Sequence, residues 1–193
     1  MITLVFATNN LNKIKEVQAL LPADFLIKRL QDIQCLEELP ETQNTIAGNS
    51  EQKAKYVAQK YHVNCFSEDT GLEIDALNGA PGVDSAFYAG DRDADKNMDK
   101  VLLELKEVKN RSAQFKTVIT LILDGKQHQF TGILKGTISF EKNGLYGFGY
   151  DPIFVADGYE KTFAELSMEE KSTISHRGIA VKELILFLQK LSQ

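Results

Sequence analysis

Residues 2–21, ITLVFATNNLNKIKEVQALL, contain the pattern from which the fold class follows. The run of β-branched and apolar side chains over 2–7 is typical of a strand buried on both faces of an α/β sheet. Apolar residues then recur at helical spacing from Leu11 to Leu21, and Pro22 follows them. The sequence therefore predicts a strand, a short polar loop and a helix.

The same two periodicities predict further elements along the chain. A turn-rich segment at 78–82, NGAPG, is expected to be a loop that separates the two halves. We therefore predict a mixed α/β fold with an antiparallel portion. The other predicted elements are a helix that begins within 44–49 and ends near 61, a strand at 65–66, a helix over 98–108, strands over 115–123 and 127–140 that form a hairpin around Asp124-Gly125, a strand at 153–155 and a helix over 181–191.

Composition is typical of a folded protein with neither a membrane nor a nucleic-acid partner. The 193 residues, 43% hydrophobic and 25% charged, predict one domain over 1–193. The net charge of −5 argues against general nucleic-acid binding, which rewards a basic surface. No apolar stretch approaches the roughly 18 residues of a membrane helix, and Cys35 and Cys65 show no CxxC or Cys/His spacing that suits zinc. We therefore expect a cytoplasmic protein.

The segment Thr8–Lys13, TNNLNK, lies where the first predicted strand ends and the helix begins. Amide N–H groups, threonine and asparagine side chains and one lysine would form a cradle for a polyphosphate. The segment matches neither glycine-rich phosphate motif. Taken alone, it is better explained as an asparagine-capped helix start with a solvated lysine.

Glu68 and Asp69 are adjacent acids where a predicted strand enters the loop 67–71. Because consecutive strand side chains face opposite ways, one of the two is expected to point into any site. A carboxylate there could hold Mg²⁺ or accept a proton from water. By itself the pair is better explained as an acidic turn. Three acids of a polar segment could supply a second carboxylate, and nothing local selects among them: Glu37, Glu38 and Glu41.

Glycines alternate with aromatic residues over 144–152, GLYGFGYDP. Glycine lets the backbone approach a flat ligand, the rings offer a stacking face, and Asp151 could accept hydrogen bonds from a base edge. A β-turn that packs its rings into the core explains the segment equally well.

Two cations and a histidine, Lys171, His176 and Arg177, precede the predicted C-terminal helix. Positive charge is unfavourable at a helix N-terminus, so these residues favour a functional role over solvated cations beside a packed histidine. His62 and His128 are interpreted as structural.

Five ordered blocks across nearly the whole chain resemble the inosine/xanthosine triphosphate pyrophosphatase family, which hydrolyses deaminated purine nucleoside triphosphates. The blocks are ATNNxxK at 7–13, EDTGL at 68–72, GAPGVxSA at 79–86, GFGYDPIF at 147–154 and EKxxxSHRG at 170–178. The resemblance implies an elongated, two-lobed α/β fold, with a mixed sheet, flanking helices and an active cleft between the lobes. It also implies a homodimer, dependence on Mg²⁺, and a nucleoside monophosphate and pyrophosphate as products.

The resemblance further implies roles for the matched residues. Glu41 and Asp69 would hold Mg²⁺, and Asp69 would be the catalytic residue that accepts a proton from the attacking water. Phe148 would stack on the base, and Lys13 would hold phosphate. The implied substrate-binding residues are Thr8, Asn9, Asn10, Asn12, Lys13, Lys53, Thr70, Phe148, Gly149, Tyr150, Asp151, Lys171, His176 and Arg177.

The choice of base is expected to depend on hydrogen-bond donors. Hypoxanthine and xanthine present a 6-keto acceptor, whereas adenine presents a 6-amino donor. A buried Arg177 or a backbone N–H that faced adenine would lose its partner, at a cost of about 1–3 kcal/mol. Guanine shares the 6-keto group, so we expect a close wall or Asp151 to disfavour its 2-amino group.

The sequence departs from the family pattern between residues 43 and 50. Gln43 replaces the usual glycine, and Gly48 stands where a glutamate commonly precedes Asn49. Two other functions are therefore kept as alternatives. One is a related pyrophosphatase that acts on pyrimidine or modified nucleotides, and the other is a sensor that binds a nucleotide without cleaving it.

Overall fold

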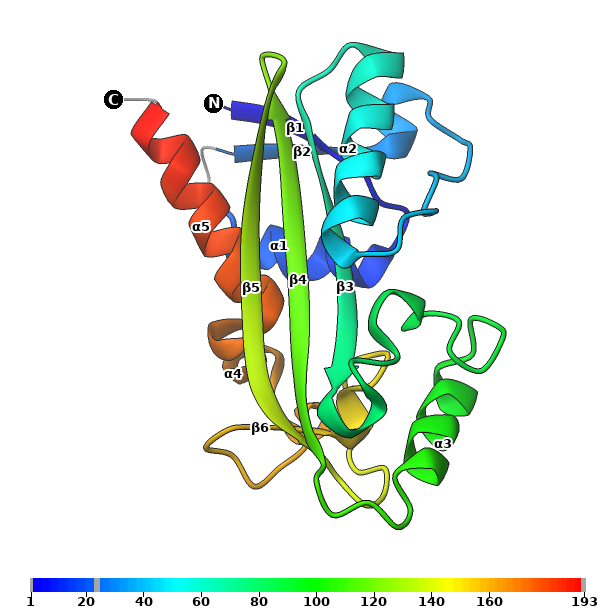
Figure 1. Ribbon diagram of the computed structural model, residues 1–193. Helices are drawn as coiled ribbons and strands as arrows, with labels where there is room; N and C mark the ends of the chain where they lie inside the picture. The colour runs from blue at the N-terminus through cyan, green and yellow to red at the C-terminus, as the bar shows by residue number, and fades with distance from the viewer. Residues whose placement is uncertain (1, 23–24, 192–193) are drawn as a thin grey trace. The chain divides into compact units, whose positions relative to one another are not determined.

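The computed structural model describes residues 2–22 and 25–191, which form a six-stranded mixed sheet with five α-helices (Figure 1). The strand order is β2-β1-β3-β4-β5-β6, in which β1 runs parallel to β2 and β3, and β6 runs antiparallel to β5. This arrangement confirms the predicted mixed α/β class. The elements are β1 (Ile2–Phe6), α1 (Leu11–Leu20), β2 (Phe25–Arg29), α2 (Ile46–Tyr61), β3 (Cys65–Ile74), α3 (Ala94–Glu104), β4 (Ser112–Leu123), β5 (Lys126–Ile138), β6 (Phe154–Ala156), α4 (Met168–Ile174) and α5 (His176–Leu191).

The chain divides into two compact units, in agreement with the expected two lobes. Unit 1 comprises Met1–Asp69, Thr117–Gly132 and Arg177–Gln193, and unit 2 comprises Thr70–Lys116 and Ile133–His176. The predicted division at 78–82 is wrong, because that loop lies wholly within unit 2. The boundaries instead cross β3, β4 and β5, where a continuous strand gives no sequence signal of a break.

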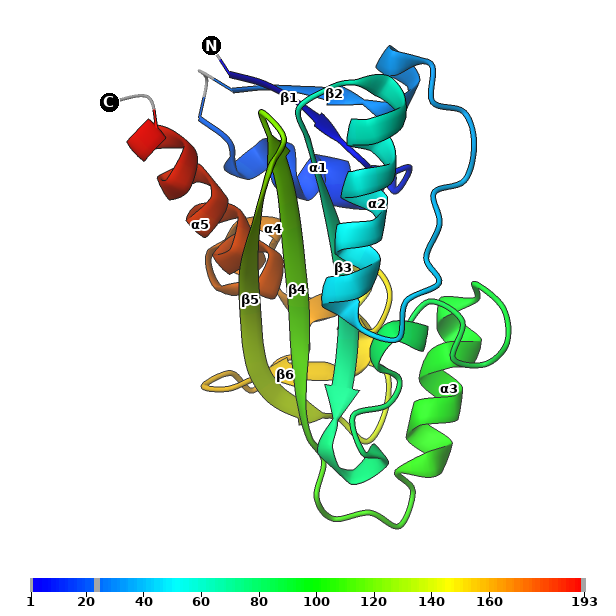
Figure 2. The same cartoon turned by 45° about the horizontal axis from the view of Figure 1, so that its top comes forward.

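The sheet of unit 1 is covered by helices on both faces. Leu4 and Phe6 of β1 pack with α1 and α5, whereas Val5 and Ala7 pack with α2 (Figure 2). This alternation confirms that the first strand is buried on both faces, as its apolar run predicts. The Phe6 and Phe66 rings stack at 4.4 Å and join β1 to β3.

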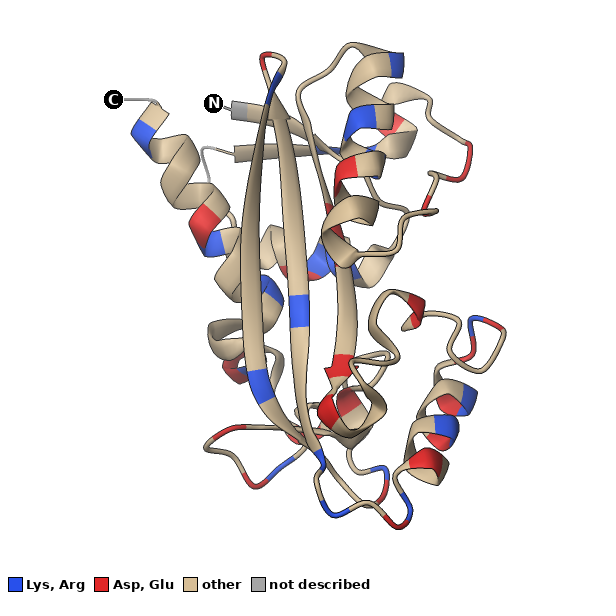
Figure 3. Cartoon of the chain, in the orientation of Figure 1, with Lys and Arg blue, Asp and Glu red and all other residues tan. Residues whose placement is uncertain are grey.

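Unit 2 is built around a cluster of aromatic rings. Phe154 lies 4.5 Å from Phe115 and 5.4 Å from Phe163, measured between ring centroids. Met98 and Val101 of α3 reach the same core. Charged positions recur along α3 (Figure 3), whereas Met98 and Val101 are buried, which is the pattern of an amphipathic surface helix.

Most predicted elements are confirmed. The two-residue turn of the β4–β5 hairpin has φ of 48° at Asp124 and 76° at Gly125, the left-handed pair that tight hairpins require. The prediction omitted β2 and α4. The start of α4 did carry a signal, since Ser167 and Glu170 form a reciprocal capping box. Within the described residues, none of the helices is long and apolar enough to cross a membrane.

Candidate active site

β3 runs straight through Glu68 and Asp69, so the predicted loop at 67–71 and the acidic turn are wrong. Glu68 is 1% exposed and Asp69 is 9% exposed. The strand continues because Leu72 and Ile74 beyond the acids are themselves buried in the core of unit 2. Carboxylates at this depth are almost always paired.

The two acids point to opposite faces of the sheet, as strand geometry predicts. Phe66 and Glu68 face α1 and α5, and Glu68 contacts residues of both helices. Ser67 and Asp69 face α2, where the Ser67 hydroxyl lies 3.2 Å from that of Ser50. The chain therefore places one buried carboxylate in each of two separate clusters.

The first cluster, here called the Asp69 cluster, consists of Glu41, Lys53 and Asp69. The Lys53 Nζ donates to Glu41 and, at 3.3 Å, to Asp69 Oδ1. Asp69 Oδ2 is buried and accepts no hydrogen bond from the described residues. Burial raises the pKa of Asp69 above its usual value; Lys53 and Lys13 oppose this rise, whereas Glu41 adds to it. Asp69 thus keeps one carboxylate oxygen for a ligand or a proton.

The carboxylates of the Asp69 cluster are chemically suited to a magnesium ion. Among the described residues, no group of three or more His, Cys, Asp and Glu side chains is arranged to hold a metal. Mg²⁺ does not need such a group, since it usually takes one or two carboxylates together with substrate phosphates and water. Asp69 Oδ2, which has no hydrogen-bond partner in the described part of the chain, and the exposed Glu41 are a donor set of this kind.

The segment that carries Glu41 is tied to α2 by a second acid, Glu37. Glu37 accepts hydrogen bonds from the Tyr61 hydroxyl at 2.7 Å and from Lys60 Nζ at 2.8 Å, both near the end of α2. From there the segment runs back along α2 to Lys53 (Figure 2). The sequence does not distinguish Glu37, Glu38 and Glu41. The fold shows that Glu37 anchors the segment to the end of α2, whereas Glu41 contacts Lys53 in the Asp69 cluster.

We expect Glu37→Gln to lower stability in a pH-dependent way. The hydrogen bond from Lys60, followed by that from Tyr61, lowers the pKa of Glu37 from 4.5 to about 2. A depressed pKa stabilises the fold above the unfolded value and loses that contribution as pH falls towards 2. The urea midpoint of the variant should therefore lie below wild type at pH 7 and approach it below pH 4.5. Glu38→Gln, at an exposed neighbour, is the control; an equal loss there would contradict the anchor.

The departure from the family pattern at residues 43 and 48 is accommodated by one local exchange. A Cβ at Gly48 would lie 2.9 Å from the Gln43 Cβ, so the glycine makes room for the glutamine. The backbone N–H of Gln43 donates to Asn49 Oδ1 at 2.9 Å, and the Thr45 side chain caps the N-terminus of α2. The helix that carries Lys53 therefore begins normally.

The segment Thr8–Lys13 forms an asparagine-capped helix start, one of the two explanations that the sequence allowed. Asn10 Oδ1 accepts from the amides of Asn12 and Lys13, at 3.0 and 3.2 Å. The Asn9 and Asn12 side chains are exposed. The expectation of a solvated lysine is wrong, because Lys13 Nζ lies 3.0 Å from Glu68 Oε1 and only 15% of its side chain is exposed.

The second cluster, here called the Glu68 cluster, consists of Lys13, Glu16, Glu68 and Arg177. The Arg177 Nε donates to Glu68 Oε2 at 2.8 Å, its Nη2 donates to Oε1 at 3.0 Å, and its Nη1 donates to Glu16. Burial opposes the charge of Glu68, but Arg177 and Lys13 outweigh it and hold the pKa of Glu68 well below its usual range. Sequence reasoning missed Glu16, which lies 161 positions from its partner.

Asp151 joins the glycine-rich loop to α4. Its Oδ2 accepts from the Phe148 amide at 2.9 Å and from Lys171 Nζ at 2.6 Å, and Asp151 is 3% exposed. Gly147 has a φ of 84°, and a side chain there would collide with the Asp151 carboxylate. The Lys171 ammonium lies 5.2 Å from the centre of the Phe148 ring. These contacts make Asp151 the internal anchor of the loop.

The remaining predicted residues of unit 2 are mostly buried. Tyr150 is 5% exposed, and its hydroxyl donates to the Ser85 carbonyl at 2.8 Å. His176 stacks on Phe115 at 4.6 Å, so the histidine packs, as in the alternative that the sequence analysis favoured less. The solvated alternative for the two cations is wrong, since Lys171 is 7% and Arg177 2% exposed. Both are retained at this depth by carboxylate partners.

The predicted site residues are divided between the two units. The residues expected to hold phosphate and metal lie in unit 1, apart from Thr70, and those expected near the base lie in unit 2, apart from Arg177. Arg177 and Asp151 were expected at the base edge. In the structure Arg177 forms ion pairs with Glu68 and Glu16, and Asp151 forms one with Lys171.

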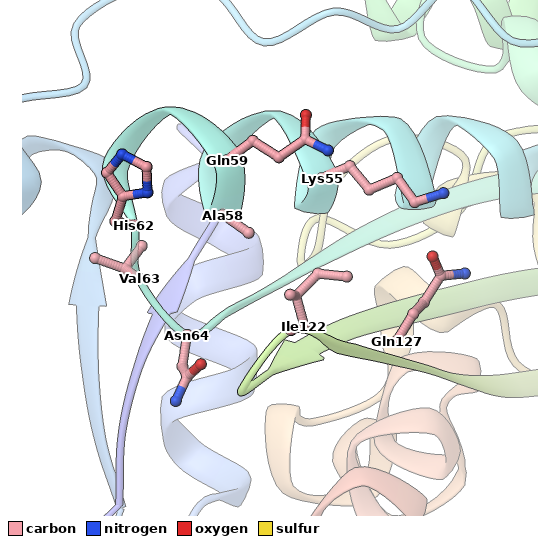
Figure 4. A pocket seen from close by; sticks show the side chains of 9 residues that line it. Lys55, Ala58, Gln59, His62, Val63, Asn64, Ile122 and Gln127 are labelled. Atoms are coloured by element: carbon pink, nitrogen blue, oxygen red, sulfur yellow. The ribbon is translucent and has the colours of Figure 1, made fainter.

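A cavity of about 430 Å³ in unit 1 is lined by none of the predicted site residues (Figure 4). Its polar lining side chains include Lys55 and Asn64, and both already have partners. Lys55 pairs with Glu51, and Asn64 exchanges hydrogen bonds with Asp124 at 2.8 and 3.0 Å. The cavity therefore adds nothing to the site.

Comparisons with known proteins agree with this architecture. A dITP/XTP pyrophosphatase of Flavobacterium johnsoniae is 60% identical over 183 residues, 94% of this chain and 95% of that protein. The Bacillus subtilis protein of the same name is 41% identical over 190 residues, 96% of each chain. The solved structure of the Staphylococcus aureus Ham1 protein matches with a TM-score of 0.90 and 36% identity, over 98% of this chain and 99% of that one. The sequence profile of the Ham1 family matches residues 4–187, and the chain belongs to that family.

Proposed function

We propose that this protein is a nucleoside triphosphate pyrophosphatase that hydrolyses dITP, ITP and XTP to the nucleoside monophosphate and pyrophosphate. The observation that carries the proposal is the Asp69 cluster, in which a buried carboxylate keeps an oxygen without a hydrogen-bond partner among the described residues. The relatives named dITP/XTP pyrophosphatase support the substrate class.

Asp69 acts as the general base of the reaction. Its Oδ2 has no hydrogen-bond partner among the described residues and can accept a proton, and Lys53 fixes its other oxygen. Asp69 Oδ2 takes a proton from water as the water oxygen attacks the α-phosphorus. The bond from that phosphorus to the bridging oxygen then breaks, and pyrophosphate leaves with the electron pair.

Residues at the start of α1 bind the triphosphate. Lys13, Asn10 and Thr8 follow the end of β1, and the lysine carries the positive charge that offsets the charge of the departing pyrophosphate. Glu41 and Asp69 would hold Mg²⁺, which when bound supplies a fixed positive charge that stabilises the phosphate oxygens. Asn9, Asn12, Lys53 and Thr70 are assigned to the same part of the substrate.

Residues of unit 2 bind the base and the sugar. Phe148 is the stacking residue, and Asp151 with Lys171 holds its backbone in place. Gly149, Tyr150 and His176 of unit 2 and Arg177 of unit 1 complete the proposed set. A 6-keto oxygen meets hydrogen-bond donors in this set, whereas a 6-amino group would leave them unpaired.

The proposal includes a single domain over 1–193, a homodimer and a cytoplasmic location. One continuous match over 4–187 supports a single domain. The net charge of −5 and two buried free cysteines support a reduced compartment with no nucleic-acid or membrane partner. Light scattering of the purified protein tests the dimer.

A substrate panel tests the proposed activity. Pyrophosphate release from dITP, ITP, XTP, GTP, ATP and dTTP is measured with Mg²⁺ and with EDTA. We expect release from the first three with Mg²⁺, and at least about tenfold slower release from ATP, since one unmet donor costs about 1–3 kcal/mol. Preference for dTTP would favour the pyrimidine alternative. Binding of dITP without release would favour the sensor.

A further inference from the structure

Glu68 lies beside the proposed catalytic Asp69, yet it faces the other side of the sheet and has no role in the mechanism above. Its carboxylate is enclosed, with 0% of the side chain exposed. It binds Arg177 through both oxygens and contacts Lys13 at 3.0 Å. A buried acid that contacts a phosphate-binding lysine can act through that lysine.

The two cations of the Glu68 cluster have different numbers of acidic partners. Arg177 pairs with two acids, Glu68 and Glu16, and is 2% exposed. Lys13 contacts Glu68, whose single charge is already engaged by the guanidinium. The positive charge of Lys13 is therefore held in place while it stays available to an anion.

The path of the chain after β1 places Lys13 beside Glu68. β1 pairs with β3 at Val5–Cys65 and Phe6–Phe66, and then turns away into the loop that precedes α1. Beyond Phe66 the edge of β3 faces the start of α1. Lys13 reaches Glu68 there, and it also lies near enough to Asp69 to act on that carboxylate electrostatically.

We propose that Glu68 is a positioning residue that holds the Lys13 ammonium in its phosphate-binding position, with Arg177 as the support that fixes the Glu68 carboxylate through both of its oxygens. The inference rests on the proposed function for the identity of the phosphate ligand. A free lysine side chain samples many rotamers, and fixing it in one of them costs conformational entropy. If the side chain is already fixed before the substrate arrives, binding does not have to meet that entropic cost. The two acids of β3 thus have different roles: Asp69 accepts the proton from water, and Glu68 fixes the Lys13 ammonium.

The test uses binding of inorganic tripolyphosphate, measured by calorimetry on the full chain. This readout needs no turnover, so it stands even if the substrate panel fails. We expect Glu68→Gln to weaken binding about tenfold, equivalent to about 1.4 kcal/mol. If Glu68 only neutralised charge, its loss would remove a repulsion and binding would tighten or stay unchanged. That result would overturn the proposal.

A double-mutant cycle shows whether the effect passes through Lys13. Lys13→Met should weaken binding, and adding Glu68→Gln to Lys13→Met should cause no further loss. A second, additive tenfold loss would mean that Glu68 acts elsewhere, and the proposal would be abandoned.

Glu16→Gln is the matched control, because it removes the other acid that pairs with Arg177 and leaves both members of the Lys13–Glu68 pair in the chain. It should leave tripolyphosphate binding within about twofold of wild type, well under the tenfold step of 1.4 kcal/mol. If Glu16→Gln weakens tripolyphosphate binding as much as Glu68→Gln does, the loss comes from general disruption of the cluster, and the proposal is overturned. If Glu68→Gln does not fold, Glu68→Asp replaces it, since it keeps the negative charge in the cluster but is one methylene shorter, which withdraws the carboxylate from its 3.0 Å contact with Lys13.

Discussion

Asp69→Asn should reduce pyrophosphate release from dITP by about 10²–10⁴-fold, the range typical of losing a general base. The amide keeps the shape of the side chain and an oxygen for Lys53, but it cannot accept a proton. Steady-state kinetics with dITP and Mg²⁺ measure the loss. Asp75→Asn, at an exposed aspartate of unit 2, is the matched control and should keep wild-type kinetics.

The same variant should fold at least as stably as wild type when EDTA is present. A carboxylate whose pKa is raised by burial opposes folding at pH values where it is ionised, so a neutral amide removes that cost at pH 7. Urea unfolding followed by circular dichroism checks this. Loss of both activity and stability would mean that Asp69 is a structural residue, and near-normal release by a folded variant would end its assignment as the base.

Local patterns predicted the elements that depend on neighbouring residues. The first strand and helix, the hairpin at Asp124-Gly125 and the helix over 46–61 all follow from apolar spacing, turn residues and caps. β2 was missed because its five residues carry only a weak alternation, with an intermediate and exposed burial pattern and no fully buried position. An edge strand of this kind is formed by pairing with β1 rather than by its own sequence.

The candidate site was harder to predict because its charges are paired over long distances along the chain. Glu68 and Arg177 lie 109 positions apart, and acids next to a glycine suggest a loop to any local pattern. Once Arg177 and Lys13 are in place, the same acids can remain inside a strand. The same holds for Lys171 and Asp151 in unit 2. From its local sequence alone, each would be predicted to be solvated, because its partner lies far away along the chain.

Asp151→Ala is expected to lower the free energy of unfolding by about 3–5 kcal/mol, because it removes one partner of a buried ion pair. The Lys171 ammonium would lose a contact of 2.6 Å, and the Phe148 amide would lose its acceptor. Asp151→Asn should lose less, since it keeps the shape and one acceptor oxygen. The chain has no tryptophan, so far-UV circular dichroism in urea follows the unfolding. Asp157→Ala, at an exposed acid of the same unit, should leave stability unchanged.

The Asp151 variants should also separate base binding from phosphate binding. If Asp151 anchors the stacking residue, Asp151→Asn should raise KM for dITP while the affinity for inorganic tripolyphosphate stays at its wild-type value. That separation is expected because the proposed phosphate ligands other than Thr70 belong to unit 1, whereas Asp151, Phe148 and Lys171 belong to unit 2. Equal losses for dITP and tripolyphosphate would contradict the anchor. A KM that stays at wild type in a folded Asp151→Asn variant would show that Phe148 keeps its place without the carboxylate.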